Sequence, residues 1–495
     1  MDRQFARSFY LFMKHRIRSL DDYRRASLIE CFHTPDVIKL HADQKLYALG
    51  DLHGDFEVMW YSLHAADLID DNGDWTGNDS IVIQLGDMCD GARGVNRVPY
   101  AGERFIINFL KNLHLQAVEE GGMVITMLGN HDVHRLLATY DANGKIVYPN
   151  VPNNYYLKKT TQYGPDLNPG IDRSFGPRAA MFMSPDNETD FRKNQSLSQL
   201  DDPNQYLDEE HGFHRQLLAS CASKLILKAE WTTRGGDETG IGILASHGEK
   251  NNRFMNRLRT FLIDQFTIID RKYGLDFLRL IEFPDKPDNF LVTINSLFSF
   301  FLRKYRTIDI DDNTAHDEPF SHMMFNFLNM IGNNYNDNFL WCYVQITSPY
   351  GGMPGSEVNT CRSAAETMNS FGLNASKSIC LSAHSGALSI PTRRIKVNRD
   401  GWCRGLADPV HENSIIMTDI MASRAFSRPV TPQIAEISFD GNGLTVGIIS
   451  AADDVINLPA HHNRPELDQK KENPINLRLK ELRGGSKRSR SRRTF

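Results

Sequence analysis

The sequence predicts an α/β protein, a layered sandwich of strands flanked by helices. Three short apolar runs, at residues 46–49, 81–85 and 123–128, each stop at a glycine. Runs of this length that stop at a glycine are typical of buried parallel strands. Apolar residues recur at helical spacing elsewhere, most clearly over residues 254–281. The 41% apolar and 24% charged content is that of an ordinary globular protein.

The first 44 residues are expected to form a helical lead-in to the main domain. Basic and apolar side chains interleave over residues 7–18, which predicts an amphipathic helix packed on that domain. A cleavable presequence is the alternative, but acidic residues at positions 2, 21 and 22 disfavour it.

A polar motif follows each of the three predicted strands. The motifs are Gly-Asp-Leu-His-Gly-Asp at 50–55, Gly-Asp-Met-Cys-Asp-Gly at 86–91 and Gly-Asn-His-Asp at 129–132. One such motif alone would be ordinary turn or helix-cap chemistry. Three at strand exits favour a ligand site, because open α/β sheets bind ligands at the carboxyl ends of their strands. Carboxylate, imidazole and amide groups suit Mn, Fe, Zn or Mg better than they suit metals that prefer thiolates.

These motifs resemble the signature of the calcineurin-like metallophosphoesterase superfamily, which reads Asp-x-His, Gly-Asp-x-x-Asp and Gly-Asn-His-Asp/Glu. The family places two more histidines downstream, and His247 and His384 match them, each after an apolar run. The resemblance implies a metallophosphoesterase β-sandwich flanked by helices. We expect this catalytic domain to span residues 45–455, with a loop-rich insertion at about 141–215 and a helical cap insertion at about 250–335.

Later segments resemble the phosphoprotein phosphatase branch of this superfamily. They are Phe-Leu-Trp at 339–341, an apolar strand at 414–418 and a closing β-hairpin at 433–450. The chain is a divergent member, since four positions depart from the branch pattern. Gly91 and Leu128 stand in place of arginines, Asp55 in place of glutamine, and Glu249 in place of glycine.

The resemblance implies a site with two divalent ions, with Mn expected and Fe, Zn or Mg as alternatives. Asp87 would bridge the ions; Asp51, His53 and His384 would complete one, and Asn130 and His247 the other. A hydroxide bridging the ions would attack phosphorus.

The resemblance also implies roles for residues around the ions. His131 would protonate the leaving oxygen, with Asp90 orienting it; otherwise Asp90 caps a loop. Arg93 and Arg362 would hold the substrate phosphate. The alternative for Arg362 is a surface arginine that opens a helix at 363–371.

The remaining segments carry less specific information. Residues 290–302 are the most apolar run, but polar residues break it before it reaches membrane-spanning length, so we expect a buried helix and no membrane span. Residues 456–495 predict a disordered basic tail, either simply solvated or in contact with an acidic partner or nucleic acid. Seven cysteines without a Cys-x-x-Cys pair favour a reducing, cytoplasmic compartment.

Three functions remain open on this evidence. The first is a protein phosphatase that acts on Ser/Thr or Tyr, with a phosphorylated protein as its partner. The second is a hydrolase of small phosphoesters such as dinucleoside polyphosphates. The third is a non-catalytic binding module, which the complete set of predicted metal ligands and His131 argues against.

Overall fold

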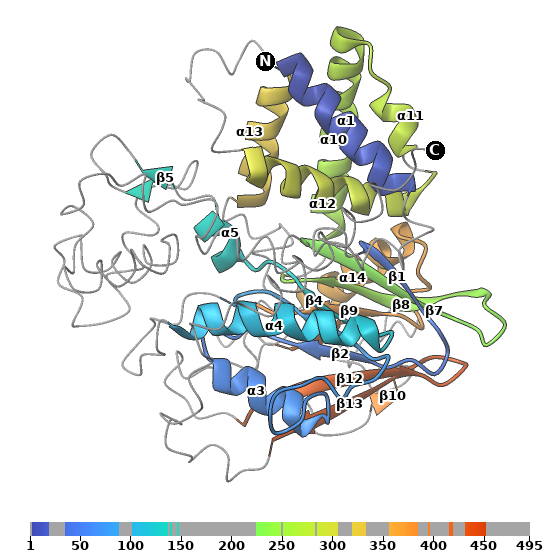
Figure 1. The fold of residues 1–495 in the computed structure, drawn as a ribbon. Helices are drawn as coiled ribbons and strands as arrows, with labels where there is room; N and C mark the ends of the chain where they lie inside the picture. The colour runs from blue at the N-terminus through green and yellow to red at the C-terminus, as the bar shows by residue number, and fades with distance from the viewer. Residues whose placement is uncertain are drawn as a thin grey trace, which may run out of the picture. The chain divides into compact units, whose positions relative to one another are not determined.

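The computed structural model describes residues 2–18, 35–88, 101–136, 139–140, 146–147, 224–248, 251–282, 285–304, 319–332, 356–384, 395–396, 415–418 and 431–451. These residues form a six-stranded sheet, a five-stranded sheet and a two-stranded ribbon, together with helices (Figure 1). The predicted α/β fold class is confirmed.

The six-stranded sheet has the order β10-β13-β12-β2-β3-β4. Its strands are β2 (Leu46–Leu49), β3 (Ile81–Gln84), β4 (Met123–Thr126), β10 (Ile395–Lys396), β12 (Gln433–Phe439) and β13 (Leu444–Ser450). As predicted, β2, β3 and β4 are fully buried and run parallel. The antiparallel hairpin of β12 and β13 lies where the sequence indicated it.

The five-stranded sheet has the order β1-β7-β8-β9-β11. Its strands are β1 (Val37–Leu40), β7 (Ile226–Thr232), β8 (Glu238–Ser246), β9 (Ile379–Ser382) and β11 (Ile415–Met417). The neighbours β8, β9 and β11 run parallel, so their carboxyl ends share one edge. We did not predict β1, which lies inside the expected helical lead-in. Four residues are too few for a recognisable pattern, and its partner β7 is almost two hundred residues away.

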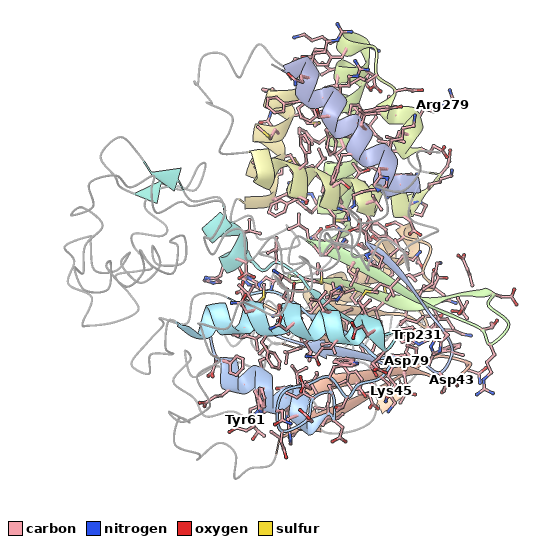
Figure 2. All side chains as sticks on the ribbon, viewed as in Figure 1. Asp43, Lys45, Tyr61, Asp79, Trp231 and Arg279 are labelled. Carbon is pink, nitrogen blue, oxygen red and sulfur yellow. The ribbon has the colours of Figure 1, made fainter. Side chains whose placement is uncertain are left out.

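The two sheets share one apolar core, as a sandwich requires. Ile81 and Ile83 of β3 belong to the same buried cluster as Leu227 and Ala229 of β7. Trp231, labelled in Figure 2, completes the cluster on β7, and its indole N–H donates to the carbonyl of Gln44 at 3.0 Å. The stacked sheets therefore hold the strand exits in a fixed relation to one another.

Helices flank the sheets, and those within the expected helical insertion are called the cap below, while their role as a cap stays a prediction. The helices are α1 (Asp2–Arg18), α3 (Phe56–Ala65), α4 (Ala101–Glu119), α5 (Asn130–Leu136), α10 (Asn252–Tyr273), α11 (Phe277–Ile281), α12 (Pro287–Lys304), α13 (Pro319–Gly332) and α14 (Ser356–Ser370). Helices α10 to α13 occupy the expected helical insertion, and α1 packs among them (Figure 1). The buried helix expected at 290–302 is α12. Among the described residues, no helix is both long and apolar enough to cross a bilayer.

Several predicted segments lie outside the described residues. They include most of the loop-rich insertion, apart from β6 (Ile146–Val147) of the ribbon with β5 (Thr139–Tyr140), and also residues 339–341 and the basic tail. Residues Met1–Ala451 group into one compact unit. The domain boundaries at 44 and 455 stay predictions.

Candidate metal centre

Five strand exits deliver the six predicted metal ligands. Asp51 and His53 follow β2, Asp87 follows β3, Asn130 follows β4, His247 follows β8 and His384 follows β9. The first five are buried, from 0% exposed for Asn130 and His247 to 7% for Asp51, and His384 is half-buried. The sandwich thus brings together side chains that lie more than three hundred residues apart in the sequence.

Main-chain hydrogen bonds lock the first two loops onto each other. The amides of Leu52 and His53 both donate to the carbonyl of Asp87, at 3.1 and 2.8 Å, and Gly54 donates to Met88 at 2.8 Å. The relative position of the β2 and β3 exits is therefore set by the backbone, before any ion binds.

Three predicted ligands have the left-handed backbone conformation that non-glycine residues rarely adopt. The φ angles are 43° for His53, 50° for Asp87 and 64° for His384. Such residues cost about 1–3 kcal/mol each and persist only where the surrounding structure holds them. Strain concentrated at three clustered polar side chains is typical of a functional site.

The loops also approach too closely to accommodate side chains at two glycines. A Cβ on Gly86 would lie 2.3 Å from the nitrogen of Gly129, and one on Gly129 would lie 2.1 Å from Oδ1 of Asp87. The glycines of the second and third motifs are therefore steric requirements of the site.

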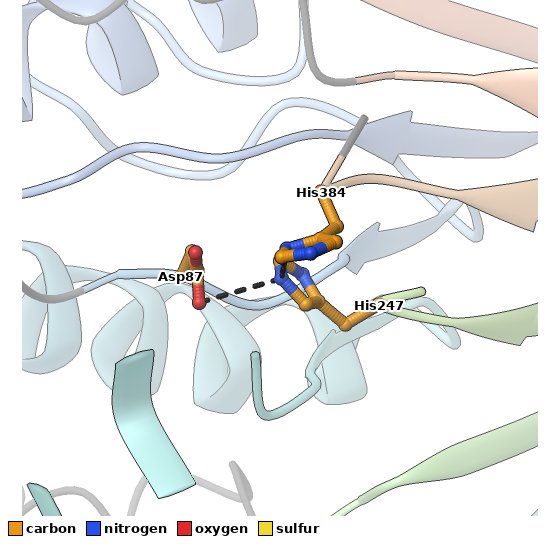
Figure 3. Close-up of side chains that lie close together, drawn as sticks. All are labelled: Asp87, His247 and His384. Carbon is orange, nitrogen blue, oxygen red and sulfur yellow. Dashed lines mark hydrogen bonds and ion pairs between the residues drawn. The ribbon is translucent and has the colours of Figure 1, made fainter. Parts of the chain in front are cut away.

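The carboxylate of Asp87 belongs to two groups of potential ligands, each with its ligand atoms within 4.8 Å of one another. In one group, Nε2 of His53 lies 3.7 Å from Oδ2 of Asp87 and 3.8 Å from Oδ2 of Asp51. In the other, Nε2 of His247 lies 3.5 Å from Oδ1 of Asp87 and 3.2 Å from Nδ1 of His384 (Figure 3). Each oxygen of Asp87 thus faces a different group, an arrangement suited to a bridging ligand.

The position of His384 differs from the expected pairing. The family resemblance assigns it to the ion held by Asp51 and His53, whereas the structure groups it with His247 and Asp87. The division of ligands between two ions therefore stays a prediction, although all six side chains approach the same edge.

The donor set fits a cation. Nδ1 of His247 lies 3.0 Å from the carbonyl of Leu85, which can only accept, so Nδ1 carries the proton of the neutral ring. The lone pair of Nε2 then faces Oδ1 of Asn130 at 2.8 Å, which is an acceptor too. Nδ2 of Asn130 has no hydrogen-bond partner among the described residues. Converging lone pairs repel one another unless a positive ion lies between them, so these residues fit a divalent cation.

His131 lies beside this centre, in the first turn of α5. Its amide donates to Oδ1 of Asp87 at 2.9 Å, and its Nε2 lies 3.8 Å from Oδ2 of the same carboxylate. The His131 ring stands edge-on to the His53 ring at 5.3 Å. Its side chain keeps 16% of its surface exposed, so a substrate can reach the ring.

The remaining predicted site residues are Asp90, the expected partner of His131, and the two phosphate ligands Arg93 and Arg362; the structure describes only Arg362 among them. Asp90 and Arg93 lie outside the described residues. Arg362 is exposed and lies in the middle of α14, because that helix begins at Ser356 rather than at 363. The next residue, Ser363, accepts the amide N–H of Asn252 at 2.8 Å, which joins α14 to the start of α10. The start of α10 lies five residues after His247.

One buried carboxylate that we did not assign supports the site. Oδ2 of Asp132 accepts the amides of Gly129 at 2.9 Å and Met88 at 3.4 Å, so it connects the second and third loops. Its position near the start of a helix could have indicated this role, since an acidic group there can bind the first free amides.

Comparison with known proteins supports the family assignment. No family model matches the chain. It is 41% identical over 91 residues to Shewanella-like protein phosphatase 2 of Arabidopsis thaliana, covering 18% of this chain and 21% of that protein. It is 32% identical over 124 residues to Shewanella-like protein phosphatase 1 of Plasmodium berghei, covering 24% and 32%. The resemblance to the metallophosphoesterase superfamily is confirmed.

Other similarities are weaker. An uncharacterized protein of Schizosaccharomyces pombe is 29% identical over 125 residues, covering 25% of this chain and 35% of that protein. The chain therefore matches between 21% and 35% of the length of these relatives. A solved cold-active protein tyrosine phosphatase aligns over 88% of this chain and 84% of its own, at 15% identity and a TM-score of 0.43. A second such structure, from a psychrophilic Shewanella, covers 86% and 84%, also at 15% identity, with a TM-score of 0.41.

Proposed function

We propose that the protein is a metal-dependent phosphatase that removes phosphate from phosphoproteins, at Ser/Thr or Tyr. The observation that carries this proposal is the carboxylate of Asp87, which belongs to two groups of potential ligands and accepts the amide N–H of His131. The two relatives named as protein phosphatases support the same class of reaction. Two divalent cations at such a site supply Lewis-acid activation of water and neutralise the charge of the phosphate.

The protein's own groups then handle the proton and orient the substrate. The ring of His131 is held close to the carboxylate of Asp87, at 3.8 Å, and retains exposed surface. An imidazole in this position can donate a proton to the leaving oxygen of a phosphoester. Asp90 is proposed to orient that ring, and Arg93 and Arg362 to bind the phosphate oxygens.

The alternative substrate is a small phosphoester. Leu128, which stands where the branch has an arginine, is fully buried in the apolar core and so cannot contact phosphate. One phosphate contact of the branch is therefore missing here, which changes the requirements for substrate binding. This change leaves a dinucleoside polyphosphate or a nucleotide as the second candidate.

A side-by-side substrate panel tests the proposal. Protein loaded with Mn²⁺ is assayed against phosphopeptides that carry phosphoserine, phosphothreonine or phosphotyrosine, and against dinucleoside polyphosphates. We expect phosphopeptide hydrolysis that a chelator abolishes and added Mn²⁺ restores. Full activity after complete metal removal would contradict the metal-dependent mechanism. Cleavage of the dinucleotides alone would favour the small-molecule alternative.

A further inference from the structure

Gln84 is a fully buried polar residue at the carboxyl end of β3, the strand between β2 and β4. Its neighbour Ile83 faces the core between the sheets, and Val82 faces the helices. A long amide side chain at this position has to find hydrogen-bond partners or destabilise the strand.

The partners of this amide are the two turns that lead to the ligands. Its Nε2 donates to the carbonyl of Gly86 at 2.6 Å and to that of Gly50 at 3.1 Å. Its Oε1 accepts the amide N–H of Gly86 at 3.1 Å. Both main-chain groups of Gly86 are therefore bound by a single side chain, as a neighbouring strand would bind them.

The hydrogen bonds of the Gln84 side chain lie between two main-chain hydrogen bonds that join the same two segments. On the strand side, the amide of Leu85 donates to the carbonyl of Leu49 at 2.9 Å. On the loop side, the amide of Leu52 donates to the carbonyl of Asp87 at 3.1 Å. Between these bonds, just past the ends of β2 and β3, the side chain of Gln84 connects the two chains.

The bound glycine directly precedes Asp87, one of the three strained residues of the site. Gly86 has a φ of 100° and Asp87 a φ of 50°. Glycine adopts a positive φ without strain, whereas a residue such as Asp87 keeps one only when its surroundings hold it in place. The Gln84 amide supplies two hydrogen bonds to Gly86.

We propose that Gln84 is a positioning residue of the metal centre. By binding Gly86 it fixes the orientation of Asp87, and by binding Gly50 it fixes the turn that carries Asp51 and His53. This inference rests on the proposed function, because it assumes that these side chains bind cations. Groups that orient metal ligands typically change metal affinity about 10–100-fold when they are lost.

The test separates metal affinity from general stability. Two variants remove the contact: Gln84→Met keeps the length without the amide, and Gln84→Asn keeps an amide that is one methylene too short to reach both turns. Val82→Ala is the matched control, because it removes buried volume from the same strand without touching the loops. Mn²⁺ binding to metal-free protein is measured by calorimetry, and urea unfolding is measured on the same samples.

We expect Gln84→Met to bind Mn²⁺ about 10–100-fold more weakly than wild type, and Gln84→Asn to show a smaller loss. Val82→Ala should lower the unfolding midpoint while its Mn²⁺ affinity stays near the wild-type value. If Gln84→Met fails to fold, Gln84→Asn decides. Unchanged Mn²⁺ affinity in the Gln84 variants, with a tightly binding wild type, would overturn the role of Gln84 alone. A wild type that binds no divalent cation would overturn the proposed function and this inference together.

Discussion

Asp87 has several roles at the proposed site, through both its main chain and its side chain. Its carbonyl accepts two amides of the neighbouring loop, its Oδ1 accepts the amide of His131, and each oxygen faces a different ligand group. Such a residue is difficult to replace, because one substitution disturbs the backbone, both ligand groups and the proposed proton donor.

We predict that Asp87→Asn lowers the occupancy of both metal positions, whereas His384→Ala weakens mainly one. An amide has only one oxygen to coordinate with, so it cannot bridge two ions as a carboxylate does. Metal content per protein, measured by elemental analysis after dialysis, distinguishes the two variants. Two full equivalents retained by Asp87→Asn would exclude Asp87 as the bridge.

His131→Asn should leave metal content intact and slow turnover by roughly a hundredfold or more, the usual effect of removing a general acid. The loss should shrink for aryl phosphates whose leaving groups need no proton. The measurement is turnover across a series of leaving groups of decreasing pKa. An equal loss across the series would show that His131 does not donate that proton.

His114 gives the fold a predictable response to acid. Burial lowers the pKa of this α4 side chain from 6.5 to about 4, and Nδ1 of the neutral ring accepts the amide N–H of Val124. Between these values the unfolded chain binds the proton and the folded one does not, so stability falls as the pH drops through this range, by up to about 1.4 kcal/mol per pH unit. His114→Gln keeps an acceptor without titrating. Its unfolding free energy should depend less on pH between 6.5 and 4, and an unchanged dependence would assign the acid sensitivity to other groups.

At the scale of elements, the exits of β2, β3 and β4 could be predicted because their signals are local. A short apolar run, a glycine and a polar ligand occupy adjacent positions, and the closing hairpin has an equally local turn.

The start of α14 and the strand β1 could not be predicted in this way. Six residues precede Arg362 in that helix, and β1 exists because β7 pairs with it. The role of Gln84 could not be predicted for the same reason. Its hydrogen bond to Gly50 depends on the folded sheet, which brings the turn at Gly50 beside the end of β3.

A buried ionic cluster connects several elements to the third loop. Asp36, before β1, accepts from Arg16 of α1 at 2.6 Å, from Asn295 of α12 at 2.8 Å and from Lys224. The carbonyl of Lys224 in turn accepts the amide of Leu128, two residues before Asn130. One carboxylate thus organises helices and strands that are distant in the sequence.

Asp36→Asn should therefore be strongly destabilising. It removes the carboxylate charge that pairs with two buried cations, Lys224 at 1% and Arg16 at 6% side-chain exposure. Removal of one partner of a buried ion pair typically costs about 3–5 kcal/mol. Lys39→Met on β1 is the control, since Lys39 is partly exposed in its pairs with Glu230 and Glu238 and should contribute less than about 1 kcal/mol. Urea unfolding measures the free energy of unfolding of both variants. If Asp36→Asn and Lys39→Met lower it equally, the buried cluster contributes no more than the partly exposed pairs do.

At the scale of the whole molecule, the amino-terminal helix α1 packs against the helices of the cap, which begin 250 residues later in the sequence. The ring of Phe9 lies 5.7 Å from Phe277, 5.1 Å from Phe300 and 5.7 Å from Phe320. The amphipathic pattern predicted that this helix packs, but the pattern could not name its partners, which depend on how the chain folds back. The packing makes this helix part of the cap.

A matched pair on this one helix tests that conclusion. Phe9 is fully buried, whereas Leu11, two residues on, is 57% exposed. If α1 is part of the folded cap, Phe9→Ala should lower the unfolding free energy by about 3–5 kcal/mol, since it leaves a cavity among aromatic rings. Leu11→Ala should change it by no more than about 0.5 kcal/mol. Mn²⁺ affinity should stay at the wild-type value in both variants, because every proposed ligand follows a strand of the sandwich. If Phe9→Ala unfolds at the same urea concentration as wild type, the helix is dispensable for the fold.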